Sequence, residues 1–288
     1  MPELPEVETL RRQLAPEMEG RAIRALEVLD PRWCEPAAPA ALADAVRGRT
    51  IDRVVRRGKY LLVELEGEVA LVMHLRMTGT LLLTDAEGDQ TGMPVPPQRP
   101  HLRARTELDD GRWVLFCDPR RFGTGEVLLG AAAVGDYFDA RLGIEPLSPD
   151  FTAAALRALA RGRRAPVKAF LLTQERIAGV GNIYADEALF RARIHPLRAV
   201  GTLRPKQVLA LRDAVVESLE AGIDARGATI DDFRHADGAR GSFQDRFLVH
   251  LREGEPCTRC GTAIRKLRAA GRGTYVCERC QPRPRIRR

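Results

Sequence analysis

Four cysteines near the C-terminus constrain the fold of this 288-residue chain more than any other feature. They are Cys257, Cys260, Cys277 and Cys280, in the pattern C-x2-C-x16-C-x2-C. Two close pairs of thiolates suit a tetrahedral Zn²⁺ ion. No histidine or carboxylate replaces a thiolate, so we expect one structural Zn²⁺ that stabilises a small fold and does no chemistry. Two disulfides are the alternative, which a cytoplasmic location disfavours.

The residues between the two cysteine pairs predict a β-hairpin. The β-prone runs 264–268 and 271–276 surround a glycine-containing turn. Residues 248–288 are therefore predicted to form a zinc-ribbon hairpin followed by a basic tail.

Positive charge is concentrated in the same region. The chain has 46 basic and 39 acidic side chains, a net charge of +7. Residues 257–288 hold ten Lys or Arg and one carboxylate, Glu278, so this stretch has a net charge of +9 and the other 256 residues have −2. Basic zinc hairpins commonly bind nucleic-acid phosphates, so the pattern predicts a grip on a polyanion. A metal-stabilised module that binds nothing is the alternative.

The composition favours a folded protein with more than one domain. Hydrophobic residues make up 44% of the chain, enough for buried cores. No run approaches 18 apolar residues, and the first residues are acidic where a signal peptide would be basic. We therefore expect a cytoplasmic protein with no membrane partner, and we expect a monomer because no sequence feature indicates oligomerisation.

The N-terminal part, residues 1–135, is predicted to be a β-sandwich fronted by one helix. Val7, Leu10 and Leu14 have helical spacing, and Gly20 ends the helix predicted over 3–19. Turn residues then separate six strand-like runs, at 60–65, 69–75, 80–84, 101–108, 112–117 and 124–129. A proline-rich stretch, 88–100, is predicted to be a loop.

Helical patterns follow, and we predict a second domain over residues 136–247. The predicted helices span 150–160, 166–174, 182–192 and 205–221. Residues 222–246 are rich in glycine and lack periodicity, so they predict a long mobile loop, a kind that is often a lid. The predicted fold class is therefore α+β with several domains.

The N-terminus carries a candidate nucleophile. Removal of Met1 before a small second residue would expose Pro2 as a secondary amine, which is partly neutral at pH 7 because α-amino groups have a pKa of about 8. Such an amine attacks an aldehyde-like sugar carbon, and its iminium is an electron sink for eliminating a neighbouring phosphate. Glu3 and Glu6 lie close by in sequence, and one could shuttle protons. Ordinary first-turn chemistry, which favours Pro and Glu, is the alternative.

Several blocks of sequence, taken in order, resemble the formamidopyrimidine-DNA glycosylase family of bacterial repair enzymes. The opening MPELPEVET is followed by RGKY at 57–60, HLRMTG at 74–79, DPRRFG at 118–123 and GVGNIYA at 179–185, before the four-cysteine finger. The resemblance implies a helical domain of the helix-two-turn-helix type. It also implies an enzyme that flips an oxidised purine out of the duplex, cuts the N-glycosidic bond and nicks the strand by β,δ-elimination.

The resemblance assigns roles at the reacting end. Pro2 matches the nucleophile, Glu3 the main acid/base and Glu6 a group that supports them. Lys59 matches a residue that contacts phosphate beside the lesion and assists catalysis. It is one of only four lysines in this arginine-rich chain, and an ammonium differs chemically from a guanidinium. A solvated charge at a strand end is the alternative for Lys59.

Four further positions match DNA contacts of the family. His74 and Asn182 match phosphate-contacting residues, and the Gly-rich turn before Asn182 opens a helix whose N–H groups suit an anion. Lys168 matches a basic residue near the lesion, and Arg272 matches the finger arginine that clamps the flanking phosphates.

Three positions match residues that fill the hole left by an extruded base. They are Met77, Arg120 and Phe122, an apolar wedge, a guanidinium and a ring that suit this task. Taken singly, Met77 and Phe122 would more often be core residues.

Two features depart from the family pattern. The pair His250-Leu251 stands where an aromatic-Gly pair is expected before the finger, and this leaves the detail of the 222–246 loop open. The tail 282–288 runs further past the last cysteine than usual, and it either adds unspecific phosphate affinity or is disordered.

The predicted function is therefore removal of oxidised purines, such as 8-oxoguanine and formamidopyrimidines, from DNA. The predicted partner is double-stranded DNA that contains such a base or an abasic site. One alternative is an endonuclease VIII-like enzyme for oxidised pyrimidines; Leu4 in place of Gly and the three hole-filling residues argue against it. A non-catalytic DNA-binding repair factor is the other, and the intact nucleophile and acid/base positions argue against that.

Overall fold

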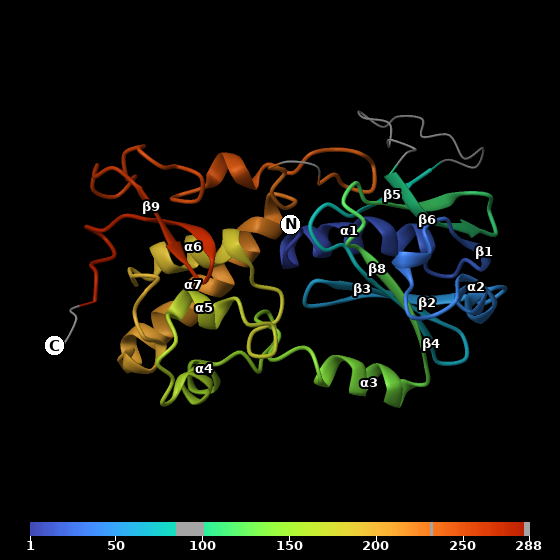
Figure 1. The fold of residues 1–288 in the computed structure, drawn as a ribbon, viewed down its shortest axis with the longest axis horizontal. Helices are drawn as coiled ribbons and strands as arrows, with labels where there is room; N and C mark the ends of the chain where they lie inside the picture. Colours follow the sequence, from blue (N-terminus) through green and yellow to red (C-terminus); the bar gives the residue numbers. More distant parts are fainter. Residues whose placement is uncertain (85–100, 231–232, 285–288) are drawn as a thin grey trace. The chain divides into compact units, whose positions relative to one another are not determined.

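The structure, a computed structural model, describes residues 1–84, 101–230 and 233–284 and divides into two compact units (Figure 1). Unit 1 contains residues 1–140 and 225–244, and unit 2 contains residues 141–224 and 245–288. The loop predicted over 88–100 lies entirely outside the described residues, as does the end of the basic tail, 285–288.

This division differs from the predicted boundaries at 135/136 and 247/248. Most of the predicted loop, residues 225–244, joins unit 1 because its side chains Phe233 and Ala236 enter the core of that unit. The finger joins the helices, since Phe190 of the helical part packs in one apolar cluster with Cys257 and Cys277.

Unit 1 contains two antiparallel four-stranded sheets, of order β1-β6-β7-β5 and β2-β3-β4-β8. Their strands are β1 (Ile23–Val28), β2 (Ile51–Arg57), β3 (Tyr60–Leu65), β4 (Val69–His74), β5 (Thr80–Leu83), β6 (Leu102–Leu108), β7 (Trp113–Cys117) and β8 (Thr124–Leu129). All six predicted strand runs appear within one or two residues of their predicted bounds, and the sandwich with its leading helix is confirmed.

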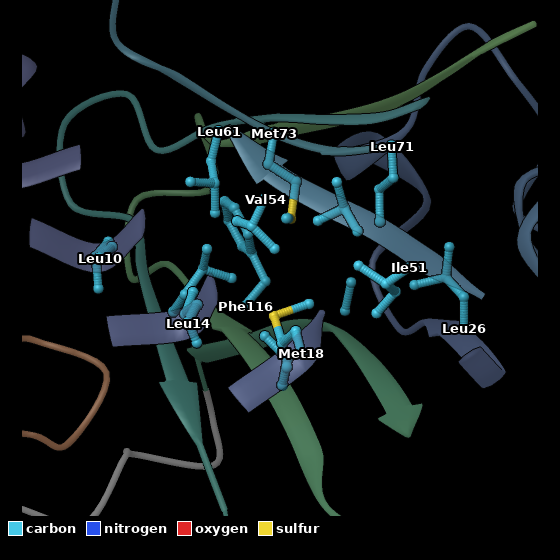
Figure 2. Packing of buried hydrophobic residues seen from close by; sticks show 14 of the residues in the cluster. Leu10, Leu14, Met18, Leu26, Ile51, Val54, Leu61, Leu71, Met73 and Phe116 are labelled. Carbon is cyan, nitrogen blue, oxygen red and sulfur yellow. The ribbon is translucent and has the colours of Figure 1, made fainter. Parts of the chain in front are cut away.

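Helix α1 (Leu4–Met18) is the leading helix, and its start is encoded locally. Glu3 is the N-cap residue, Pro5 lies in the first turn, and a capping box links Glu3 with Glu6. The apolar stripe of Val7, Leu10 and Leu14 is fully buried in the core that the two sheets share. Figure 2 shows this packing, with Leu10 and Leu14 on the helix side of the cluster that includes Phe116.

Several elements of unit 1 carried no clear periodic signal. Strands β1 and β2 mix buried and partly exposed positions without strict alternation. The short helices are α2 (Pro39–Val46), α3 (Ala131–Asp139) and the 3-10 turn η1 (Pro31–Trp33). Helix α3 occupies the stretch predicted as a domain boundary, and it buries only Phe138.

Unit 2 consists of helices and one hairpin. The helices are α4 (Ala153–Ala160), α5 (Val167–Leu171), α6 (Asn182–Arg191) and α7 (Pro205–Asp224), with 3-10 turns η3 (Val200–Thr202) and, at the unit boundary, η4 (Phe243–Arg246). All four predicted helices are present. Strands β9 (Arg265–Ala269) and β10 (Arg272–Val276) form the predicted antiparallel hairpin. Among the helices of the described ranges, none is long and apolar enough to cross a membrane.

Candidate functional site

The predicted nucleophile and acid/base lie in a buried corner at the start of α1. Pro2, Glu3 and Glu6 are all buried, and Glu3 and Glu6 each expose only 1% of their surface. Glu6 Oε2 accepts a hydrogen bond of 2.8 Å from the backbone N–H of Glu3. Its other oxygen, Oε1, accepts one of 2.7 Å from the backbone N–H of Ala228. The Glu6 carboxylate therefore links the backbone of Glu3 to the 225–244 segment, which favours a positioning role over proton transfer.

Gly227 makes this link possible. Its φ of +74° is favourable only for glycine, and a Cβ at this position would lie 2.9 Å from Glu6 Cγ and 2.9 Å from Glu6 Oε1. The backbone of residues 227–228 therefore approaches the carboxylate more closely than any other residue type would allow.

The described residues of the 225–244 segment, which was predicted as part of a mobile loop, form hydrogen bonds to α1 and β5 of unit 1. The N–H of Ala236 donates to Gln13 Oε1 of α1 at 3.0 Å, and its carbonyl accepts from the N–H of Leu83 of β5 at 3.0 Å. Thr80 Oγ1 donates to the carbonyl of Arg234 at 2.7 Å. Residues 222–224 of the predicted loop are instead the end of α7.

Lys59 lies in the two-residue turn between β2 and β3, beside Gly58, whose φ is +55°. It exposes only 5% of its surface, so the alternative of a solvated charge at a strand end is wrong. Arg56 holds this turn, since its Nη1 donates to the carbonyl of Gly58 at 3.1 Å while its Nε donates to Glu8 at 3.3 Å. The arginine was not singled out by sequence reasoning, although it directly precedes the RGKY block.

His74 ends β4 next to this turn, because it pairs in register with Tyr60. Its ring contacts the Tyr60 ring edge-on, with centroids 4.5 Å apart. Burial, with Arg76 and Lys59 nearby, lowers the pKa of His74 to about 3. The backbone N–H of Arg76 donates to Nδ1 at 2.9 Å, so the neutral ring carries its proton on Nε2. His74 is thus a neutral hydrogen-bond donor beside Lys59.

One buried carboxylate, Asp118, forms hydrogen bonds to both loops that carry the predicted hole-filling residues. Asp118 is fully buried and accepts hydrogen bonds from the N–H groups of Phe122 at 2.8 Å and Gly123 at 2.7 Å. It also accepts from the N–H of Arg120 at 3.1 Å and from the hydroxyl of Thr78, the residue after Met77. Asp118 therefore ties the Met77 loop to the 120–123 loop, a role that sequence reasoning missed although the residue opens the DPRRFG block.

The predicted side chains on these loops are exposed. Met77 exposes 37% and Phe122 52% of their surfaces, so the alternative that they are core residues is wrong. The Arg120 guanidinium lies over the Phe122 ring, 4.9 Å from its centroid.

Within unit 2, a second group of predicted residues surrounds the hairpin. Asn182 begins α6, and its Nδ2 donates to the carbonyl of Gly273 at 3.2 Å. Arg272 is exposed at the start of β10, directly after the hairpin turn. The amide and the guanidinium therefore lie at the same end of the hairpin.

Lys168 differs from its prediction as a residue that contacts DNA. Its side chain is fully buried, and its ammonium lies 2.7 Å from Asp186 Oδ1. The ammonium also donates to Thr274 Oγ1 at 2.8 Å and to the carbonyl of Gly273 at 3.2 Å. A buried charge requires a partner, and Asp186 supplies one beneath the hairpin. This ion pair explains why a lysine occurs at position 168.

Asp186 and Glu187 are adjacent on α6 and bind residues 248–250, which precede the finger. Asp186 Oδ2 lies 2.9 Å from Nδ1 of His250, whose ring packs edge-on against Phe247 and Tyr275. Glu187 accepts hydrogen bonds from three consecutive backbone N–H groups, those of residues 248–250. Neither carboxylate was singled out from the sequence, because residues 248–250, which both of them bind, lie more than 60 residues further along the chain.

The structure also explains the departure at His250-Leu251. His250 retains a ring between two aromatic neighbours and adds a bond to Asp186. Leu251 has a φ of +59°, which is unfavourable for a residue with a Cβ. The glycine that the family pattern calls for would adopt this backbone without strain.

The four finger cysteines fit a single zinc ion. Their sulfur atoms all lie within 4.8 Å of one another, with Cys257 and Cys280 3.9 Å apart and Cys260 and Cys277 3.5 Å apart. Four thiolates at these separations suit tetrahedral Zn²⁺. The other two cysteines, Cys34 and Cys117, are buried, and burial raises the pKa of both thiols, that of Cys117 to about 12.

Comparison with known proteins supports the resemblance over the whole chain. The formamidopyrimidine-DNA glycosylase N-terminal domain matches residues 1–125, the H2TH domain of the same enzyme matches 142–234, and a zinc finger found in FPG and IleRS matches 254–283. The formamidopyrimidine-DNA glycosylase of Symbiobacterium thermophilum is 46% identical over 285 residues, covering 99% of this chain and 90% of that protein. The enzyme of Chloroflexus aurantiacus is 43% identical and covers 98% of both chains.

Solved structures give the same result. Lactococcus lactis Fpg in complex with DNA containing an abasic site is 34% identical, with a TM-score of 0.86, and the match covers 98% of this chain and 100% of that chain. Complexes of that protein with Fapy-dG DNA and with DNA containing an oxidised pyrimidine have the same identity, coverage and TM-score.

These matches define a DNA glycosylase with a helix-two-turn-helix domain and a zinc finger, as predicted. More narrowly, the chain belongs to the formamidopyrimidine-DNA glycosylase family.

Proposed function

We propose that this protein removes oxidised purines from double-stranded DNA and then cleaves the strand at the resulting abasic site through an N-terminal proline. The observation that carries the proposal is the buried corner at the start of α1, where Glu6 fixes the backbone of Glu3 next to Pro2. The names of the relatives, and the abasic-site and Fapy-dG complexes of the Lactococcus lactis protein, support the substrate class.

The chemistry begins once Met1 is removed and the nitrogen of Pro2 is a secondary amine. The amine attacks C1′ of the damaged nucleotide while the base leaves, and Glu3 supplies the proton that the opening sugar needs. The resulting iminium acidifies the sugar, so that loss of a C2′ proton expels the 3′ phosphate and loss of the C4′ proton then expels the 5′ phosphate.

DNA contacts in unit 1 support this chemistry. Lys59 and the Nε2–H of His74 offer an ammonium and a neutral donor to one phosphate beside the lesion. Met77, Arg120 and Phe122 fill the space of the extruded base, as their exposure and their shared anchor at Asp118 suggest.

DNA contacts in unit 2 come from the hairpin end. Arg272 and Asn182 bind phosphates, and Lys168 acts indirectly by holding the hairpin strand. The zinc ion, held by the four cysteines, supplies rigidity to the hairpin and no chemistry. We further propose that the protein acts as a monomer in the bacterial cytoplasm, in line with its bacterial relatives.

The test is reductive trapping. With borohydride and an abasic-site duplex, we expect a covalent adduct that peptide mapping assigns to Pro2, and Pro2→Gly should trap about tenfold slower or worse. Pro5→Ala, a change in the same helical turn, is the control and should trap as the unchanged protein does. Equal trapping of Pro2→Gly through a lysine would refute the assignment, and no trapping by any form would support a non-catalytic DNA-binding factor.

Oxidised pyrimidines are the second candidate substrate, because one Lactococcus lactis complex contains such a base. Duplexes with 8-oxoguanine and with thymine glycol, compared under single-turnover conditions, separate the two. We expect faster cleavage at 8-oxoguanine; faster cleavage at thymine glycol would assign the chain to the endonuclease VIII type of activity.

A further inference from the structure

Unit 2 has a second concentration of positive charge, away from the finger in sequence. Residues 157–166 and 198–206 contain seven Lys or Arg and no carboxylate. The seven, which we name the α4–η3 basic patch, are Arg157, Arg161, Arg163, Arg164, Arg198, Arg204 and Lys206. The charge count of the chain outside the finger, −2, conceals this local excess.

Tertiary structure joins the two segments. The N–H of Gly201 donates to the carbonyl of Arg163 at 3.0 Å, and the N–H of Val200 donates to the carbonyl of Ala165 at 3.0 Å. The N–H of Val167 donates to the carbonyl of Arg198 at 2.7 Å, and Pro166 and Ala199 form an antiparallel bridge. A Cβ at Gly201 would lie 2.7 Å from the carbonyl oxygen of Arg163, so the two backbones are in close contact.

The charges of this patch are available to a ligand. All seven residues are exposed except Arg198, which is partly buried. None of them forms an ion pair with any carboxylate in the described ranges, whereas cations on the sandwich such as Arg24, Arg53 and Arg105 each pair with a glutamate. Two of the patch guanidiniums are oriented by their own segment, since Arg163 donates to the carbonyl of Leu159 and Arg198 to that of Thr202.

We propose that the α4–η3 basic patch binds the sugar-phosphate backbone of duplex DNA, as a contact additional to those of the lesion site. Six of the seven cations are arginines, whose guanidinium forks match phosphate oxygens. The two segments contain no aromatic residue, so neither base stacking nor insertion into a lipid surface is indicated. The contact is therefore independent of sequence and acts through charge alone.

This inference rests on the proposed DNA repair function, and its test is the salt dependence of DNA affinity. The variant Arg157→Gln/Arg161→Gln/Arg164→Gln removes three cations whose side chains have no other recorded partner in the described structure. The matched control, Arg24→Gln/Arg53→Gln/Arg105→Gln, removes the same charge from sites where a glutamate already neutralises it. The probe is a lesion-free duplex of about three helical turns.

We expect the plot of log affinity against log salt to become shallower. The magnitude of its slope should fall by about 0.9 per lost phosphate contact, hence by about 2 to 3 in the patch variant. At low salt this corresponds to an affinity at least about tenfold weaker, while the control triple stays within about twofold of the unchanged protein. Single-turnover cleavage at saturating enzyme should be the same in all three proteins, because the patch is not part of the reacting site.

Equal slopes for the patch variant and the control would overturn the proposal. A second result would also overturn it. If the patch variant keeps the DNA affinity of the unchanged protein but no longer binds phosphatidylserine vesicles that the unchanged protein binds, the patch binds an anionic membrane instead. A protein that cuts neither 8-oxoguanine nor abasic DNA would refute the proposed function instead, and the DNA slopes would still decide the role of the patch.

Discussion

Two buried carboxylates, one in each unit, are held in different ways. In unit 1, Glu6 is held by backbone N–H groups, one from Glu3 in its own helix and one from Ala228. In unit 2, Asp186 is held by charged and ring side chains, the ammonium of Lys168 and the imidazole of His250. Two backbone N–H groups fix the Glu6 carboxylate in unit 1, whereas an ammonium balances the charge of Asp186 in unit 2.

The difference corresponds to what each region has to do. Under the proposed function, the corner beside Pro2 needs a carboxylate in a fixed position, and two backbone N–H groups hold Glu6 in this way. Under the proposed function, the hairpin binds DNA and needs a rigid support beneath its strands. The Lys168 ammonium supplies it, because it pairs with Asp186 and also donates to Thr274 and to the carbonyl of Gly273. A buried carboxylate therefore positions the backbone beside Pro2 in unit 1 and supports the hairpin in unit 2.

Loss of zinc should have the largest effect on the architectural side. Cys277→Ser should lose the metal, unfold the hairpin and weaken DNA binding by about 100-fold or more, because structural zinc contributes about 10 kcal/mol or more to such small folds. Metal content and duplex affinity are the measurements, with the buried, isolated Cys117→Ser as the control that keeps one zinc per chain. Retained affinity without metal would mean that the buried ion pair suffices to hold the hairpin.

Breaking the ion pair should come next. Asp186→Asn leaves the Lys168 ammonium buried without an anion, so unfolding of the protein in urea should require about 3–5 kcal/mol less free energy. The double variant Asp186→Leu/Lys168→Met, which removes both charges, should recover most of that loss. If the double variant is as unstable as the single one, packing and not charge stabilises this region.

Glu6→Gln tests the backbone-held carboxylate. The amide oxygen can accept one of the two N–H groups, but its NH₂ would face the other, so we expect a loss of about 1–3 kcal/mol in stability and slower glycosylase cleavage. Glu17→Gln, on the exposed part of the same helix, should change neither. Normal cleavage by Glu6→Gln would show that the link between Glu3 and Ala228 is dispensable for the chemistry.

His74 should make unit 1 sensitive to acid. Its folded pKa of about 3 lies below its unfolded value of 6.5, so the unfolded chain binds the extra proton as pH falls. The contribution of His74 to the free energy of unfolding is complete above pH 6.5. It is lost as the pH falls toward 3, by at most about 1.4 kcal/mol per pH unit. Urea unfolding at pH 7.5 and at pH 5 should show this slope, and His74→Gln should reduce it; an unchanged slope would assign the acid sensitivity to other groups.

Leu251→Gly should have the smallest effect and the opposite sign. Relief of the φ of +59° should stabilise unit 2 by about 0.5–1 kcal/mol, partly offset by the greater freedom of glycine in the unfolded chain. Thermal unfolding measures this, and Leu248→Gly, at a nearby position without positive φ, should destabilise. A destabilised Leu251→Gly would mean that the exposed leucine side chain makes a contact that outweighs the strain.

Much of the site could be predicted from the sequence because the signals are local. Glu3 and Glu6 lie three positions apart and each cysteine pair is a C-x2-C motif, so both signals could be recognised without knowledge of the fold. The ordered blocks predicted Pro2, Lys59 and Met77 as site positions in the same way, and the resemblance of the finger predicted Arg272. Strands β1 and β2 were less distinct, because irregular burial along each of them blurs the alternation that periodicity requires.

Tertiary structure alone decided which residues support these positions. The hydrogen-bonded residues Lys168 and Thr274 are 106 positions apart in sequence. Glu6 and Ala228 are 222 positions apart, and Thr78 and Asp118 are 40 positions apart. A basic residue in a DNA-binding motif reads as a surface charge until the fold buries it against a carboxylate. The sequence by itself determined the family and the four zinc-finger cysteines, since short-range spacing encodes them. The fold decided where each charge is buried or exposed, since burial depends on contacts that no local pattern specifies.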